Sequence, residues 1–242
     1  MHALFSRTLF LGISLPLFFS SVSLSDDGFK NESELGFVLT TGNTDTTTLN
    51  LKQANIYAFG QNSLIFKGGY LTSKQRGILA VETWNLGLRY ERALTERVSI
   101  YLGQSLMADT FQNIRQRHNS DVGGKMYFSK DDTFVWFGES GYRFTRENTT
   151  NVGSRNLHYI RAYTELEKKW NAGVSTKYFV EYLPNLTESR DWQLNSEISV
   201  NAMLSSMFSV KTGYLVRFDN LPADPGLRKT DSILTTALVA KF

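Results

Sequence analysis

The chain has 242 residues and no cysteine, which excludes thiolate catalysis, disulfides and zinc sites built from cysteine ligands. Its formal net charge of +3 is spread thinly along the sequence, so the composition gives no sign of a nucleic-acid-binding surface. Four prolines are few for a chain rich in strands, and three of them fall outside the strands predicted below, as continuous backbone pairing requires.

Residues 1–25 have the pattern of a cleaved secretory signal peptide. Arg7 precedes an apolar run over residues 9–19, and small residues follow up to Ser25, where we expect cleavage. The run is too short to cross a membrane as a helix, and no later segment reaches the roughly 20 apolar residues that such a helix needs. If the mature chain spans a membrane, it must therefore do so as a closed β-barrel, which also satisfies every backbone polar group in lipid.

The first two strands are predicted as a hairpin. Residues 26–32 are polar and acidic and form a short lead, after which residues 33–41 alternate between apolar and polar positions. The sequence Gly42-Asn43-Thr44-Asp45 then predicts a tight turn, because glycine and asparagine tolerate positive φ. Residues 46–59 continue the alternation and complete the hairpin.

The same alternation recurs ten more times, so residues 33–242 are expected to form one domain of twelve strands. A mean of about 18 residues per strand and connection fits a membrane-spanning strand of 9–11 residues. The outward-facing positions of the ten further strands begin, in chain order, at Leu64, Trp84, Val98, Val122, Phe134, Ile160, Val174, Trp192, Phe208 and Ser232.

The connections are predicted to alternate in length. Short ones follow the even-numbered strands, and longer ones follow most odd-numbered strands, at residues 73–81, 109–117, 146–155, 183–190 and 219–230. This alternation is typical of an outer-membrane barrel with short periplasmic turns, longer outer loops and both termini in the periplasm. On that orientation, the lead at residues 26–32 is periplasmic.

The aromatic residues give an independent argument for a membrane barrel. Because strand direction alternates, outward residues such as Tyr90 and Trp170 fall at the short-turn end, and Trp84 and Trp192 fall at the other. A soluble β-sandwich also has alternating strands, but its core has no reason to sort aromatic residues into two rings. The sequence therefore predicts an all-β, antiparallel, up-and-down transmembrane barrel in a bacterial outer membrane, with outer-membrane lipids and lipopolysaccharide as its surroundings.

The last strand, residues 231–242, keeps its outward register to the terminal Phe242. A terminal aromatic residue on such a strand resembles the signal that the barrel-assembly machinery recognises, so this resemblance implies that machinery as a partner. Residues 42–51, with the Gly-Asn-Thr turn and a threonine-rich alternating strand, resemble the YdiY-like family of salt-induced outer-membrane proteins. The resemblance implies an outer-membrane location and an association with salt or osmotic conditions; the molecular activity of the family is unassigned, so no catalytic residue is carried over.

The face opposite the lipid register is polar and carries charges of both signs. The candidate luminal charges are Arg89, Glu91, Lys125, Glu139, Arg143, Arg161, Glu165, Lys177, Glu181, Glu197 and Lys211. Large side chains such as Tyr127, Phe137 and Phe179 share this face and take up space. Barrels of eight strands are filled by side chains and barrels of 16–18 strands hold an aqueous channel, so twelve strands leave two alternatives open: a closed lumen, or a narrow passage for ions or small solutes.

Two other classes of function are weaker. An outer-membrane hydrolase needs a histidine base beside a nucleophile, but His118 and His158 of the mature chain have no evident partners, so no catalytic residue, metal or cofactor is predicted. The predicted loops at 112–118 and 146–155 are basic, and a surface-binding or structural barrel is the remaining alternative. Its candidate contacts to lipopolysaccharide phosphates are Arg115, Arg117, Arg146 and Arg155.

Overall fold

The computed structural model describes residues 28–40, 46–110, 112–151, 153–222, 226 and 228–241. The predicted signal peptide, the turn Gly42-Asn43-Thr44-Asp45 and the terminal Phe242 lie outside these described residues. No helix long and apolar enough to cross a membrane occurs in the described part of the chain.

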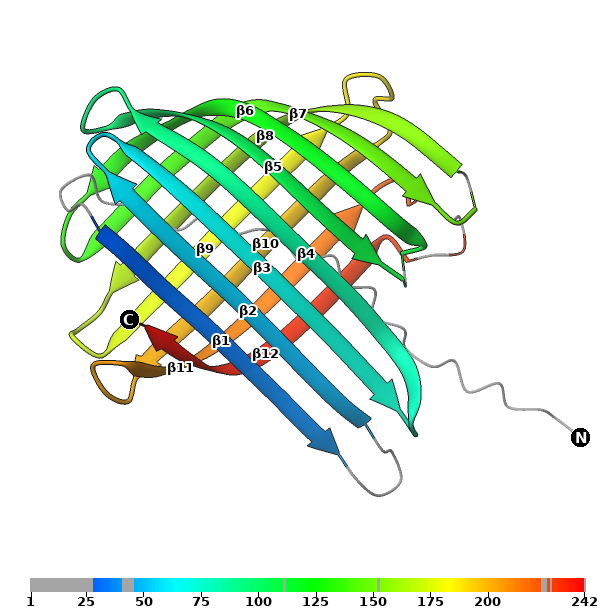
Figure 1. The fold of residues 1–242 in the computed structure, drawn as a ribbon, viewed down its shortest axis with the longest axis horizontal. Helices are drawn as coiled ribbons and strands as arrows, with labels where there is room; N and C mark the ends of the chain where they lie inside the picture. The colour runs from blue at the N-terminus through cyan, green and yellow to red at the C-terminus, as the bar shows by residue number, and fades with distance from the viewer. Residues whose placement is uncertain are drawn as a thin grey trace, which may run out of the picture.

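The described residues form twelve β-strands. They are β1 (Gly28–Thr40), β2 (Thr46–Phe59), β3 (Asn62–Gln75), β4 (Ile78–Ala93), β5 (Val98–Asp109), β6 (Ile114–Lys130), β7 (Phe134–Thr149), β8 (Gly153–Lys169), β9 (Val174–Pro184), β10 (Trp192–Met203), β11 (Phe208–Asp219) and β12 (Thr230–Lys241). Each strand pairs antiparallel with its neighbours in sequence, and β1 pairs with β12, so the sheet closes into an up-and-down barrel (Figure 1). The predicted fold class is confirmed.

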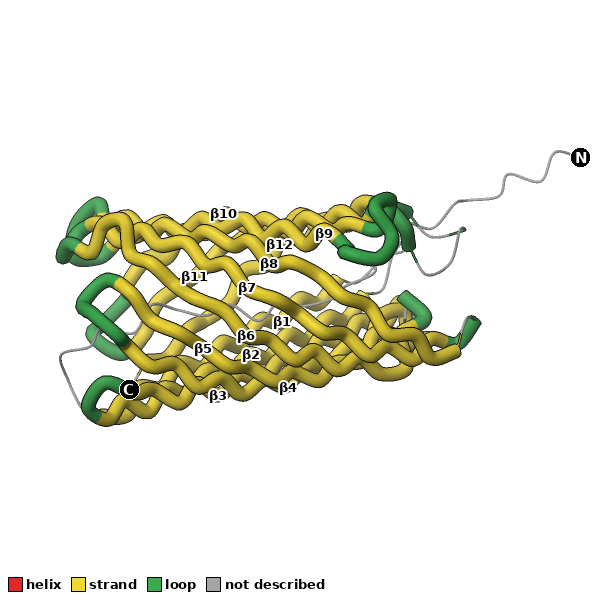
Figure 2. Tube along the Cα trace, turned by 90° about the horizontal axis from the view of Figure 1, so that it is seen from above, coloured by secondary structure: helices red, strands yellow, loops and turns green. Residues whose placement is uncertain are grey.

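The barrel has two distinct ends. The turn end carries Gly28, Lys241 and the connections that follow the even-numbered strands; the loop end carries the connections that follow the odd-numbered strands. In Figure 1 the turn end lies to the left and the loop end to the right. The barrel is narrower in Figure 2 than in Figure 1, so its cross-section is flattened.

The wall is apolar outside and polar inside, because side chains of a strand point alternately to its two faces. On β3, Leu64 and Phe66 are exposed on the outer surface, whereas Ser63, Ile65 and Lys67 are buried inside. Buried polar groups beneath an exposed apolar surface invert the pattern of a soluble protein and match a barrel whose outer band faces lipid. The outward register predicted from the sequence is confirmed on this strand.

The strands are longer than the sequence pattern predicts. β1 begins at Gly28, so residues 28–32 belong to the wall and are not a lead. The predicted long connection at 73–81 is wrong: β3 and β4 are joined by Arg76 and Gly77, both with positive φ, as a tight two-residue hairpin requires. Apolar alternation marks only the part of a strand that faces lipid, whereas backbone pairing continues beyond it, so the pattern underestimates strand length at both ends of the barrel.

The seam between β1 and β12 is the shortest ladder in the described sheet. It has four residue pairs, from Glu32 with Lys241 to Leu35 with Leu238, whereas the next shortest ladder, between β8 and β9, has eight. Towards the loop end the two strands diverge, and Figure 1 shows the arrowhead of β1 well apart from the start of β12. There, residues 36–40 and 230–237 pair on one side only.

We expect this part of the seam to open before the rest of the wall. Amide hydrogens in strands paired on one side only exchange through local opening of lower free energy. Peptides covering residues 36–40 and 230–237 should therefore exchange about tenfold faster than peptides from the doubly paired β6 and β7. Hydrogen–deuterium exchange of the folded barrel, read by mass spectrometry, measures this. Equal protection in both regions would show that the seam is closed along its whole length in solution.

Candidate functional site

The inward face of β4 to β9 carries an ion-pair network at mid-height. Arg89 of β4 donates to Glu139 of β7 through both terminal nitrogens, at 3.1 and 2.8 Å, and to Glu91 of its own strand at 2.9 Å. Lys125 of β6 reaches the second oxygen of Glu91 at 3.3 Å. Residues 50 positions apart in the chain are thus joined inside the barrel.

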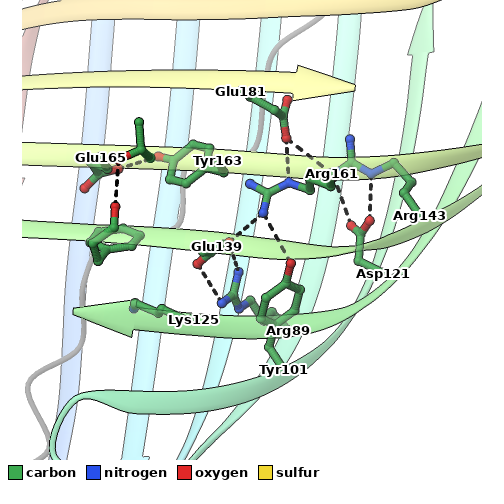
Figure 3. Close-up of polar contacts among 12 residues, drawn as sticks. Arg89, Tyr101, Asp121, Lys125, Glu139, Arg143, Arg161, Tyr163, Glu165 and Glu181 are labelled. Atoms are coloured by element: carbon green, nitrogen blue, oxygen red, sulfur yellow. Dashed lines mark hydrogen bonds and ion pairs between the residues drawn. The ribbon is translucent and has the colours of Figure 1, made fainter. Parts of the chain in front are cut away.

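Glu139 is shared between two arginines. Arg161 of β8 donates to the Oε2 atom of Glu139 at 2.5 Å and to Oε1 of Glu181 at 2.6 Å. Glu181 also lies 3.7 Å from Arg143, which forms a two-point contact with Asp121 at 2.7 and 3.1 Å (Figure 3). The central network, as we call these residues, has four basic and four acidic members, namely Arg89, Lys125, Arg143 and Arg161 with Glu91, Asp121, Glu139 and Glu181.

The wall makes room for this network through two glycines. Gly123 of β6 and Gly141 of β7 are register partners, and a Cβ atom at either would lie 2.5 or 2.7 Å from the hydroxyl of Tyr101. The Tyr101 ring therefore lies against bare backbone, and the Arg89 guanidinium stacks over it at 3.8 Å from the ring centre. Glycine is required here for close approach, and the stacking fixes the direction in which Arg89 points.

Apolar side chains pack together inside the lumen beside the network. Leu71 of β3, Leu215 of β11 and Ile233 of β12 pack against aromatic residues from β6 to β9, which project from other parts of the wall. The luminal apolar cluster comprises Leu71, Tyr127, Phe137, Tyr163, Phe179, Leu215 and Ile233. Side chains from separate parts of the wall thus pack in one cluster, which takes up space in the lumen.

Further ion pairs line the turn-end side of the lumen. Lys177 lies 3.3 Å from Glu165 and 3.6 Å from Glu167, and Tyr163 donates to Glu165 at 2.5 Å. On the other side of the barrel, Glu34 of β1 accepts from Lys211 of β11 at 2.7 Å and lies 3.7 Å from Lys52 of β2. These contacts link β1 to its neighbour β2 and, across the seam, to β11.

A polar cavity opens on the loop-end side of the network. It encloses about 690 Å³ of empty space, including its opening to solvent. The loop-end cavity is lined by Asn85, Ser105, Leu106, Met107, Arg117, Asn119, Arg143, Thr145, Tyr159, Glu181, Leu183, Gln193, Asn195 and Arg217. Two of its walls are held by buried contacts: Arg117 pairs with Glu147, and Tyr159 donates to Asp191 at 3.0 Å.

The structure places all eleven predicted luminal charges on the inward face. Ten of them form ion pairs: Arg89, Glu91, Lys125, Glu139, Arg143, Arg161, Glu165, Lys177, Glu181 and Lys211. Glu197 is buried beside Gly213 and has no ion pair to a described residue. The sequence did not predict the role of Tyr101. The signal for it was the inward register of Gly123 and Gly141, which leave room for a large side chain. Nor did the sequence predict a special role for Arg217.

The basic residues assigned to surface loops lie on strands. Arg117 of β6 and Arg155 of β8 both turn inward and share Glu147 of β7, so they belong to the loop-end rim of the lumen. Arg115 and Arg146 are exposed, on β6 and β7. The loop assignment was wrong for the same reason as above: the strands continue past the lipid band.

The two histidines in the described part of the chain stand on the outer surface. His118, expected in a loop, lies on β6, and His158 of β8 hydrogen-bonds the Tyr142 hydroxyl and packs against Phe144. Within the described residues, no group of three or more histidine, cysteine, aspartate or glutamate residues has a metal-binding arrangement.

A protein-family model described as "Protein of unknown function, DUF481" matches residues 33–242. A search of curated proteins finds no match. Solved structures similar to this chain include the NanC porin, at 7% identity and a TM-score of 0.49, covering 88% of this chain and 98% of that one. The KdgM porin has 8% identity and a TM-score of 0.47, over 89% and 98% of the two chains. The translocator domain of the autotransporter NalP from Neisseria meningitidis has 9% identity and a TM-score of 0.47, over 90% of each chain.

Proposed function

The chain belongs to the family described as "Protein of unknown function, DUF481". We propose that it is a bacterial outer-membrane barrel whose lumen is closed at rest. The observation that carries the proposal is Glu139, a buried carboxylate held between Arg89 and Arg161 at mid-height. The signal-peptide pattern and the apolar outer face support the location, with both termini in the periplasm and lipopolysaccharide at the outer rim.

Two layers of side chains support a closed lumen. The central network joins β4 to β9 through hydrogen-bonded ion pairs, and the luminal apolar cluster brings β3, β11 and β12 against β6 to β9. Opening a passage would separate charges that are buried together, and an uncompensated buried charge is costly. Buried pairs are also screened much less than surface pairs, so added salt alone should not open the network.

The proposal assigns no enzymatic role, because His118 and His158 lie on the outer surface, away from the cavity. Assembly through the last strand, read by the barrel-assembly machinery, is part of the proposal. The association with salt or osmotic conditions remains what the family resemblance implies. Any passage of ions or small solutes would require the central network to rearrange.

Recording single channels in planar bilayers tests the closed lumen. We expect the wild-type protein to give no large conductance steps. Glu139→Gln removes the charge that holds Arg89 and Arg161 together, so this variant should give frequent steps with altered ion selectivity.

The matched control is Glu188→Gln. Glu188 lies in the exposed connection between β9 and β10, where it bonds Arg190, so its loss leaves the lumen unchanged. Large, weakly selective steps from the wild-type protein would contradict the closed lumen and indicate a general porin. An absence of conductance steps from both the wild type and Glu139→Gln would show that the central network does not gate conduction.

A further inference from the structure

Arg217 is an unusual member of the loop-end cavity. It projects inward from β11, is 4% exposed, and none of its three guanidinium nitrogens has a hydrogen-bond partner among the described residues. The other two arginines that line the cavity are held: Arg117 by Glu147, and Arg143 by Asp121. A buried guanidinium with five unused donors carries a desolvation cost that a bound acceptor would relieve.

A second unpartnered donor faces the same space. The side-chain nitrogen of Asn85 on β4 is buried without a hydrogen-bond partner, and Asn85 is 3% exposed. Arg217 and Asn85 come from strands that are far apart in the sequence, yet both line this cavity. Two donors that lack acceptors in one cavity indicate a ligand rich in acceptor atoms.

The acidic groups around Arg217 do not form hydrogen bonds with its guanidinium group. Asp109, Asp231, Glu197 and Glu181 are near enough to interact with its charge, but none forms an ion pair with it. Asp231 is its register partner on β12. These carboxylates leave the hydrogen-bonding edge of Arg217 available to a ligand.

The rest of the lining suits a small polar solute. Asn119, Asn195, Gln193, Ser105 and Thr145 supply neutral amide and hydroxyl groups beside Arg217. The enclosed part of the cavity, with about 70 Å³ of room for water-sized groups, is small, so the ligand must be small as well. The lining residues other than Leu106 lie on the luminal side of their strands, so the cavity belongs to the lumen and not to the lipid surface.

We propose that the loop-end cavity binds a small soluble anion that carries a carboxylate or phosphate group. Arg217 donates two parallel hydrogen bonds to two oxygens of that group, and the Asn85 amide donates to the anion as well. The paired fork geometry of arginine matches both anions. Anion binding at this site does not depend on conduction, so it is tested separately from the closed lumen.

Equilibrium dialysis of the folded protein in neutral detergent micelles tests the site, with inorganic phosphate and acetate as the probes. We expect saturable binding of both. Arg217→Met should lower the affinity roughly tenfold or more, and Arg217→Lys should lower it less, because a lysine keeps the charge but not the fork. Asn85→Leu should lower it a few-fold.

The control is Arg190→Met, which removes an arginine at the same end of the barrel that is exposed and paired with Glu188. Its affinity should equal that of the wild type, and the unheated electrophoretic mobility of each variant reports whether it is folded. Unsaturable binding, or equal losses in Arg217→Met and Arg190→Met, would overturn the site. Loss of phosphate binding in bilayers that contain lipopolysaccharide would identify a lipid phosphate as the occupant and overturn a soluble solute.

Discussion

Replacing Glu139 by glutamine is expected to lower the free energy of unfolding by about 3 to 5 kcal/mol, the range measured when one partner of a buried ion pair is removed. Glu139 neutralises two guanidinium groups, from Arg89 and Arg161, and all three side chains are almost completely buried. Glutamine keeps the shape but leaves those two cations with less opposing charge in a space that water does not reach. Urea titration of the protein folded into lipid bilayers measures the change.

Glu167→Gln is the matched control for this prediction. Glu167 lies on β8, is 28% exposed, and its partner Lys177 keeps a shorter contact with Glu165 after the substitution. Its cost should therefore stay below about 1 kcal/mol, as for a solvent-screened pair. If the two glutamine variants unfold at the same urea concentration, the central network does not hold the barrel together.

The number of strands and their register could be predicted because each strand alternates between chemically opposite residues. On β3, for example, Phe66 and Lys67 are neighbours in the chain, but Phe66 faces the outside and Lys67 faces the lumen. A slip of one residue would exchange them, so one register is strongly favoured over the whole barrel. The limits of the strands carried no such signal, since residues 28–32 and 114–117 are paired outside the alternating apolar band.

The partners of the luminal charges could not be predicted from the sequence. Arg89 reaches Glu139 because of the stagger between strands and the flattening of the barrel. The local periodicity of the sequence predicts neither property. The position of Tyr101 depends on Gly123 and Gly141, which are 18 residues apart and become neighbours only through the β6–β7 register. Sequence patterns assign a side chain to the inner face, whereas packing across the lumen decides what it contacts there.

The outer surface of β12 gives the second large effect. Leu234 is 71% exposed and projects from the wall, whereas the neighbouring Thr235 faces inward. Leu234→Arg places a charge in lipid, which costs about 2 to 4 kcal/mol near the middle of a bilayer. Thr235→Arg places the same charge on the luminal side of the strand, and its cost there should be smaller.

The two arginine variants differ by one position in the chain, so strand propensity and net charge are matched between them. Folding titrations of both into bilayers separate the lipid face from the lumen, with Leu234→Ala as the control for lost apolar contact. Equal costs for Leu234→Arg and Thr235→Arg would mean that β12 does not hold this register in a membrane. A large cost confined to Leu234→Arg would place the outward face of the closing strand in lipid, together with Tyr214, its register partner on β11.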